Sequence, residues 1–160
     1  MGESLSTGTE KTYNPPPMHE FQARRRVEFS DTDMGGIVHF ARFFVFMEWV
    51  EHEFLRSLGA APGSFQDEEG RRIAWPRVAA TCEYLSPARF GDELDIYIRV
   101  LRKGRTSLSY GIEILKGEAA VARGKVSVVY CLIDGGDGLK PIPIPPEIAD
   151  LIDEAPTPPS

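Results

Sequence analysis

The stretch Ser30–Phe40, SDTDMGGIVHF, and the helix expected after it decide the fold of this chain. Two aspartates flank a threonine, two glycines follow, and an aromatic-rich segment begins at Phe40. This pattern predicts a strand that runs into a tight turn and then onto a helix N-terminus. Free backbone N–H groups would then lie close to a carboxylate, which suits chemistry on a carbonyl group.

The segment 40–58 is predicted to be one long amphipathic helix. A spacing of 3.6 residues per turn gathers its apolar residues on one broad face: Phe40, Phe43, Phe44, Met47, Val50, Phe54, Leu55 and Leu58. Gly59 is a typical helix terminator. Glu51 falls inside the apolar stripe and Glu48 lies at its margin. A carboxylate that faces a core must find a partner, line a polar cavity or shift its pKa.

After a connector at 60–76 rich in charge and turn formers, the pattern becomes that of strands. Alternating apolar residues in 93–101 and 106–115 each put one face of a strand in the core. With segments 21–29, 77–85 and 119–133, they predict an antiparallel sheet of about five strands. Helix and sheet each need an apolar partner, so we expect an α+β fold with the sheet curled around the helix.

Length and composition limit the classes of protein. We expect one folded domain over 19–153, between a disordered arm at 1–18 and a disordered tail at 154–160. A formal net charge of -6 and a pI near 5.1 argue against general nucleic-acid binding. No apolar run approaches the ~20 residues of a membrane span.

The chemistry-bearing residues point away from metals and cofactors. The three histidines have no metal-binding spacing, and neither a G-x-S-x-G elbow nor a Walker-type phosphate loop occurs, so we expect no cofactor. Cys82 and Cys131 lie in strand-like runs and could pair. No apolar leader begins the sequence, so we expect a cytoplasmic protein with reduced thiols.

Three segments together resemble a known family. They are FSDTDMGGIVHFARFFVFMEWVEHEFLRSLG, then CEYLSPARFGDEL, then the hairpin GRTSL. The chain between residues 21 and about 146 resembles the hotdog-fold acyl-CoA thioesterases of the 4-hydroxybenzoyl-CoA thioesterase type. The resemblance implies a sheet wrapped on a central helix, homodimers or homotetramers built by edge-to-edge pairing, and active sites at the subunit interface.

By position, the resemblance puts the catalytic carboxylate on Asp33 and the carbonyl-polarising backbone amide at or next to Phe40. Asp33 would act as a nucleophile that forms a mixed anhydride or as a general base for water, and the sequence does not choose between them. Taken alone, Asp33 is more simply an Asx-turn residue ahead of Gly35. The helix, its acidic residues and the downstream segments reverse that preference.

The substrate contacts implied by the resemblance fall in two regions. Near the helix they are Gly36, His39, Glu48 and Glu51. The simpler roles are packing over the turn for His39, and a snorkelling carboxylate or inter-subunit salt bridge for each glutamate. The second region is the basic hairpin, where some family members contact the phosphates of coenzyme A: Arg102, Lys103, Arg105 and Thr106.

Three functions therefore compete. The first is hydrolysis of an aliphatic or aryl thioester, carried on coenzyme A or an acyl carrier protein, to a free acid and a thiol. The second is a non-catalytic acyl-CoA binding or sensing module, which would not need the Asp33 carboxylate beside a thioester. The third is a hotdog hydratase or dehydratase, for which a catalytic histidine with an acidic partner is expected. The presence of Asp33 favours the hydrolase.

Overall fold

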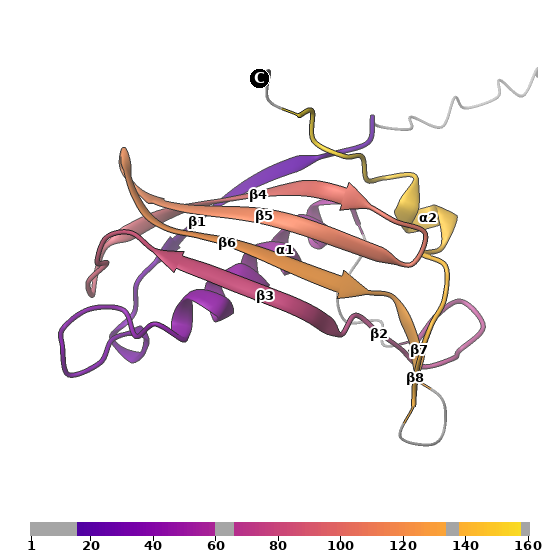
Figure 1. Cartoon of the computed structure of the whole chain (residues 1–160), viewed down its shortest axis with the longest axis horizontal. Helices are drawn as coiled ribbons and strands as arrows, with labels where there is room; N and C mark the ends of the chain where they lie inside the picture. The colour runs from indigo at the N-terminus through magenta and orange to yellow at the C-terminus, as the bar shows by residue number, and fades with distance from the viewer. Residues whose placement is uncertain (1–15, 60–65, 134–137, 158–160) are drawn as a thin grey trace, which may run out of the picture.

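Five antiparallel strands curl around one long helix in the computed structural model, which describes residues 16–59, 66–133 and 138–157 (Figure 1). The sheet has the order β1-β4-β5-β6-β3. Its strands are β1 (Glu20–Arg26), β3 (Arg77–Tyr84), β4 (Glu93–Lys103), β5 (Ser107–Lys116) and β6 (Ala119–Val129). Helix α1 (Arg42–Ser57) lies against its concave face. The predicted α+β architecture is confirmed.

Alternating side chains on the two central strands form the sheet side of the core. β4 and β5 pair in a register that sets Ile96 opposite Ile114 and Ile98 opposite Ile112. All four are buried. Burying a side chain of this size contributes roughly 1.5–3 kcal/mol relative to leaving it exposed. The predicted alternation along these strands is therefore confirmed.

The helix begins two residues later than predicted. Its N-cap is Ala41, and its buried face is Phe43, Phe46, Met47, Val50, Glu51, Phe54 and Leu55. Phe40 was expected in the core, but this is wrong: its side chain is 62% exposed. Phe40 precedes the first helical turn, so the helical periodicity does not apply to its side chain.

A second, three-stranded sheet was not expected from the sequence. Its strands are β2 (Ile73–Ala74), β7 (Cys131–Ile133) and β8 (Leu139–Pro141), in the order β2-β7-β8. The predicted strand 119–133 is thus two strands, separated at Tyr130, whose N–H donates to the Thr106 carbonyl. Part of the predicted connector, residues 60–65, lies outside the described residues.

Both ends of the described chain join the fold beyond the domain limits that we expected. Met18 forms a parallel bridge with Ile152, and the Ala155 N–H donates to the Val100 carbonyl at 2.8 Å. The short helix α2 (Pro146–Ala149) lies between these contacts and the small sheet. Backbone pairing therefore reaches residues 18 and 155, which no local sequence pattern indicates. Residues 1–15 of the expected arm and 158–160 of the expected tail lie outside the described residues.

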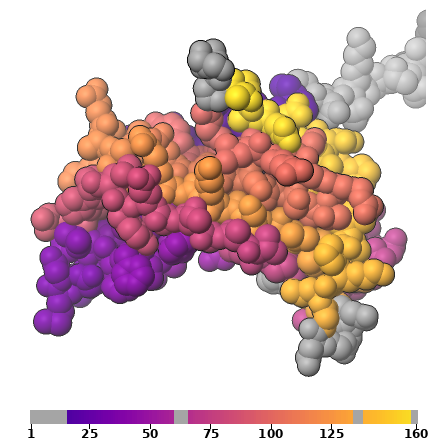
Figure 2. Space-filling model, viewed as in Figure 1, coloured from indigo at the N-terminus to yellow at the C-terminus, as the bar shows by residue number. Residues whose placement is uncertain are grey.

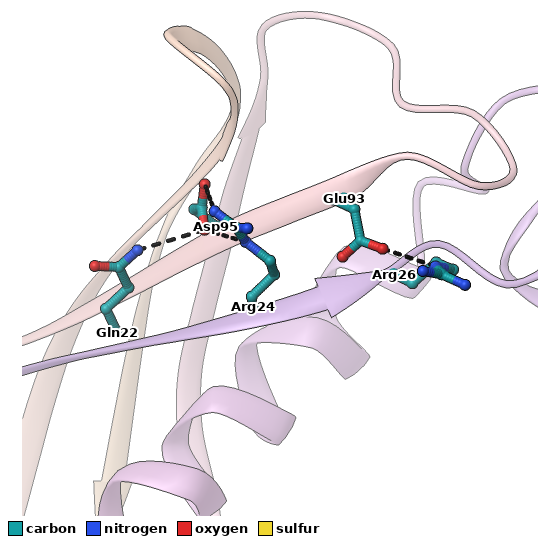
Figure 3. A network of polar contacts seen from close by, with 5 residues as sticks. All are labelled: Gln22, Arg24, Arg26, Glu93 and Asp95. Carbon is teal, nitrogen blue, oxygen red and sulfur yellow. Dashed lines mark hydrogen bonds and ion pairs between the residues drawn. The ribbon is translucent and has the colours of Figure 1, made fainter.

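The three successive arginines of β1 point alternately outward and inward. Arg24 and Arg26 form ion pairs on the outer face with Asp95 and Glu93 of β4 (Figure 3). Both arginines are well exposed, so water screens each pair and its contribution to stability is small. Arg25 points inward, with its guanidinium 4.9 Å from the centre of the Phe46 ring. Successive side chains on a strand point to opposite faces, which places these adjacent arginines in different surroundings.

Gly124 is required by the packing between α1 and the sheet. A Cβ at this position would overlap the end of the Met47 side chain and lie 2.7 Å from the Thr81 carbonyl oxygen. Met47 can move, but the carbonyl belongs to the neighbouring strand β3. We predict that Gly124→Ala lowers the free energy of unfolding by about 1–3 kcal/mol, measured by urea denaturation. Gly138→Ala, where a Cβ meets nothing within 4 Å, is the control. Equal stability of both variants would contradict the prediction.

Candidate active site

The acidic turn forms a closed loop at one end of the sheet. After β1, a short 3-10 helix (Phe29–Asp31) leads into the loop at residues 31–39, which Thr32 and Val38 close as an antiparallel bridge. The Asp33 N–H donates to the Ile37 carbonyl at 3.1 Å. Gly36 has φ +73°, which favours glycine. In Figure 2 this part of the chain, in indigo and purple, projects at the lower left.

The Asp33 carboxylate both shapes the loop and faces outward. Its Oδ1 accepts a hydrogen bond from the Gly35 N–H at 2.7 Å, which is the predicted Asx turn. A Cβ on Gly35 would lie 2.9 Å from that oxygen, so glycine permits the close approach. Asp33 is exposed, and no hydrogen bond to its Oδ2 occurs within the described parts of the chain. The turn therefore orients the carboxylate without using both of its oxygens.

One backbone donor just before α1 has no partner within the part of the chain that the structure describes. The N–H groups of Val38 and His39 donate to the carbonyls of Ala88 and Asp31, and that of Ala41 donates to His39 Nδ1 at 3.2 Å. Among residues 16–59, 66–133 and 138–157, nothing accepts a hydrogen bond from the Phe40 N–H. An amide at the positive end of a helix attracts a partly negative oxygen. This is the amide on which the resemblance put carbonyl polarisation.

Aromatic rings cluster at Phe40. The Phe40 carbonyl accepts a hydrogen bond from the Tyr84 hydroxyl at 3.3 Å, and their rings meet edge to face at 6.5 Å. The Tyr84 ring also lies 5.5 Å from that of Phe43. The His39 ring stacks on Phe40 at 4.6 Å while its Nδ1 accepts from Ala41. His39 thus packs over the turn, which was the simpler of its two expected roles.

Glu48 and Glu51 share one arginine. Arg77 lies at the start of β3, with its Nη2 2.8 Å from Glu51 Oε2 and its Nη1 3.3 Å from Glu48 Oε1. Glu51 is 2% exposed, and its burial raises its pKa above the ordinary value more than Arg77 lowers it. The Tyr110 hydroxyl is buried near this pair, and burial raises its pKa as well. Both glutamates are thus engaged within the chain, one buried and one half exposed.

The basic hairpin between β4 and β5 lies at the opposite end of the sheet from the loop at residues 31–39 within one chain (Figure 1). β4 has 11 residues, so at about 3.3 Å per residue its ends are roughly 33 Å apart. The Lys103 ammonium donates to the carbonyls of Ala149 and Ile152 at 3.1 and 2.6 Å. The backbone carbonyls of Arg105 and Thr106 accept hydrogen bonds from the N–H groups of Ile144 and Tyr130, respectively. One subunit therefore does not bring this hairpin to the acidic loop.

The described residues contain no group of three or more His, Cys, Asp or Glu side chains that could hold a metal ion. No helix among them is long and apolar enough to cross a membrane.

Comparisons with known proteins agree on one family. A family model described as "Thioesterase-like superfamily" matches residues 27–152. The acyl-CoA thioester hydrolase YbgC of Escherichia coli O6:H1 is 31% identical over 107 residues, which are 67% of this chain and 78% of that protein. A solved 1,4-dihydroxy-2-naphthoyl-CoA thioesterase from Synechocystis aligns with a TM-score of 0.72 at 25% identity, covering 82% of this chain and 97% of that chain. The solved structure of a hypothetical protein from Aquifex aeolicus aligns with a TM-score of 0.72 at 28% identity, covering 83% of this chain and 99% of that chain.

The burial of Glu51 predicts a pH-dependent cost to stability. A carboxyl whose pKa is raised by folding binds its proton more tightly in the native state, so stability falls as pH rises from the ordinary Glu value of about 4.5 through the raised pKa. Glu51→Gln keeps the shape and removes this titration. We predict that the wild type loses free energy of unfolding relative to Glu51→Gln over that window, measured by urea denaturation at a series of pH values. A relative gain would mean that attraction to Arg77 outweighs burial.

Proposed function

Since the chain belongs to the thioesterase-like superfamily, we propose that it hydrolyses an acyl-CoA thioester to a free acid and coenzyme A, with Asp33 and the Phe40 amide at the centre of the site. The predicted resemblance to hotdog-fold acyl-CoA thioesterases is confirmed, and the protein is a thioester hydrolase. The observation that carries the residue assignment is the unpartnered Phe40 N–H beside a loop that presents an outward-facing carboxylate.

The two groups divide the reaction between them. The thioester carbonyl oxygen accepts the Phe40 N–H, and the positive end of α1 stabilises the negative charge that develops on that oxygen. Removing one such donor costs about 2.7–4 kcal/mol in other hydrolases. Asp33 either attacks the carbonyl carbon to form a mixed anhydride, which water then cleaves, or removes a proton from the attacking water. In both routes coenzyme A leaves through its sulfur and ends as the thiol.

We propose an aryl rather than an alkyl thioester as the substrate. The rings of Phe40, Phe43 and Tyr84 adjoin the polarising amide, and flat aromatic rings pack favourably edge to face or offset. The relative from Synechocystis is named for a naphthoyl-CoA substrate. An acyl carrier protein remains the other candidate carrier of the thioester.

We further propose a homodimer paired along β3. This strand is one edge of the sheet, and all but one of its residues are exposed. Its middle, Val78–Cys82, carries no charge, whereas the opposite edge strand β1 carries three arginines. An uncharged free edge is a template for strand pairing.

Antiparallel pairing of β3 with itself would explain the separation of the two predicted regions. The two strands would run in opposite directions, so the Asp33 end of one subunit would lie beside the hairpin end of the other. Arg102 and Arg105 of the partner subunit would then be available to the phosphates of coenzyme A. Glu48 of the partner subunit, which is half exposed, would approach the acyl group from the same side, whereas Glu51 is buried within its own subunit. The second subunit would also shield the exposed Asp33 from water.

The first prediction concerns Asp33. Asn can still accept the Gly35 N–H, so Asp33→Asn keeps the turn and removes the charge. We predict a loss in kcat of about 10²–10⁴-fold with unchanged thermal stability, measured by thiol release from benzoyl-CoA, hexanoyl-CoA and palmitoyl-CoA. Asp67→Asn is the matched control, since Asp67 accepts the Glu69 N–H in the same kind of turn elsewhere. We expect benzoyl-CoA to be the best substrate of the three.

Other results would change the assignment. Undiminished activity of Asp33→Asn would remove Asp33 from the mechanism. Tight binding of benzoyl-CoA with no thiol release by the wild type would favour the binding module instead. Hydration of an enoyl-CoA without thiol release would favour the hydratase.

The second prediction concerns the subunit pairing. Sedimentation velocity should give twice the chain mass of 17.8 kDa. Val78 is 64% exposed on the free edge, so we predict that Val78→Lys shifts the protein toward the monomer and lowers activity. Leu139→Lys places the same change on the exposed surface of the small sheet and should alter neither property. A monomeric wild type would contradict the proposed dimer.

A further inference from the structure

We propose that Arg42 is a positioning residue: through its ion pair with the buried Asp31, it holds the start of α1 so that the Phe40 amide stays open beside Asp33. The inference extends the proposed function to a residue that does not itself touch the substrate. It rests on three features of the helix start.

The first feature is that α1 begins against the usual rules of helix capping. Its N-cap is Ala41, which makes no side-chain cap, and its first turn contains no acidic residue. Ser, Thr, Asp and Asn are strongly preferred at this position because they accept a free N–H of the first turn. The first helical residue is instead Arg42, a cation at the positive end of the helix dipole. Nothing in the helix itself compensates for this arrangement.

The second feature is the carboxylate that does compensate. Asp31 is 0% exposed, and its Oδ1 accepts hydrogen bonds from Arg42 Nε at 2.9 Å and Nη2 at 2.6 Å. The Asp31 Oδ2 accepts a hydrogen bond from the Glu28 N–H at 2.9 Å, and the Asp31 backbone carbonyl accepts one from the His39 N–H at 2.9 Å. Asp31 thereby joins the exit of β1, the end of the loop and the first turn of the helix.

The third feature is the position of the two proposed reacting groups relative to this pair. Asp33 lies two residues after Asp31, and Phe40 lies two residues before Arg42. The pair therefore holds both ends of the loop that carries them. A fixed approach geometry matters greatly, because a displacement of about 1 Å can cost 10²-fold in rate.

The pair also supplies the negative charge that the missing N-cap side chain does not. A conventional N-cap side chain accepts the N–H of the second or third helical residue, here Phe43 or Phe44. Asp31 supplies the stabilising negative charge at the helix N-terminus while its hydrogen bonds go to Arg42 and Glu28. The Phe40 N–H is left without a partner among the described residues. This accounts for a helix start that breaks the local rules at the place where the site needs it.

The variants must separate positioning from folding. Arg42→Met alone leaves Asp31 buried without its counter-charge and is expected to destabilise the protein. The double variant Asp31→Asn/Arg42→Met removes both charges and is expected to fold. Arg56→Met is the control, since Arg56 makes an exposed ion pair with Glu53 near the other end of the same helix.

We predict that the folded double variant loses about 10²-fold in kcat on benzoyl-CoA, with KM within twofold of the wild-type value. The single variant Arg42→Lys should have a kcat between those of the double variant and the wild type. An ammonium cannot make the two hydrogen bonds that the planar guanidinium makes to Asp31. Arg56→Met should match the wild type. Wild-type kcat in the folded double variant would overturn the inference.

A second measurement does not depend on turnover. In the Asp33→Asn background, the infrared C=O band of bound benzoyl-CoA should move to lower frequency relative to free benzoyl-CoA. This shift should disappear when Asp31→Asn/Arg42→Met is added. A retained shift would overturn the inference even if kcat falls.

The proposed function and the positioning role can fail separately. If the wild type neither binds nor hydrolyses benzoyl-CoA, hexanoyl-CoA or palmitoyl-CoA, the proposed function fails. The role of Arg42 is then decided by ¹⁵N relaxation of the Phe40 amide. Increased mobility of this amide in the double variant would support the positioning role of Arg42, and unchanged relaxation would overturn it.

Discussion

The burial of one face of α1 inside the curl of the five-stranded sheet is the constraint on which the rest of the structure depends. The helix carries its apolar residues along its whole length, and the central strands offer a matching apolar face. Neither surface is stable in water alone. Their contact is close enough to require Gly124 beneath Met47, and it fixes where the helix begins relative to the strand ends. The acidic loop is thereby held at one end of the sheet.

At that loop, the structural and the chemical interpretations of the same residue coincide. Asp33 is an Asx-turn residue, and the turn is what aims its carboxylate outward. Phe40 lies outside the core because the helix starts after it, and its N–H has no partner within the described structure. Asp31 and Arg42 add a buried ion pair that links the strand, the loop and the helix. A local departure from the rules of helix capping is the mark of this site.

The remaining polar residues show why the proposed site would need two chains. Arg77 engages both Glu48 and Glu51, and Lys103 engages carbonyls of the C-terminal segment, so these charges stabilise a single subunit as it stands. The hairpin and the acidic loop lie at opposite ends of the sheet. A strand paired antiparallel with its own copy reverses the direction of the second sheet. A free and uncharged β3 is therefore the feature that connects the fold to the proposed site.

The sequence by itself determined the elements and their faces. Hydrophobic periodicity predicted α1, the alternation along β4 and β5, and the sheet-on-helix architecture, because that periodicity is local. The resemblance of the segment Ser30–Phe40 to a known family also proposed Asp33 and the neighbourhood of Phe40 as the site. Only the tertiary structure decided that Arg42 pairs with Asp31, that Arg77 reaches Glu51, and that Lys103 binds the C-terminal segment. These partners are 11, 26 and about 46–49 residues apart. Contacts at such separations follow from how the helix and the sheet pack, which no local pattern encodes.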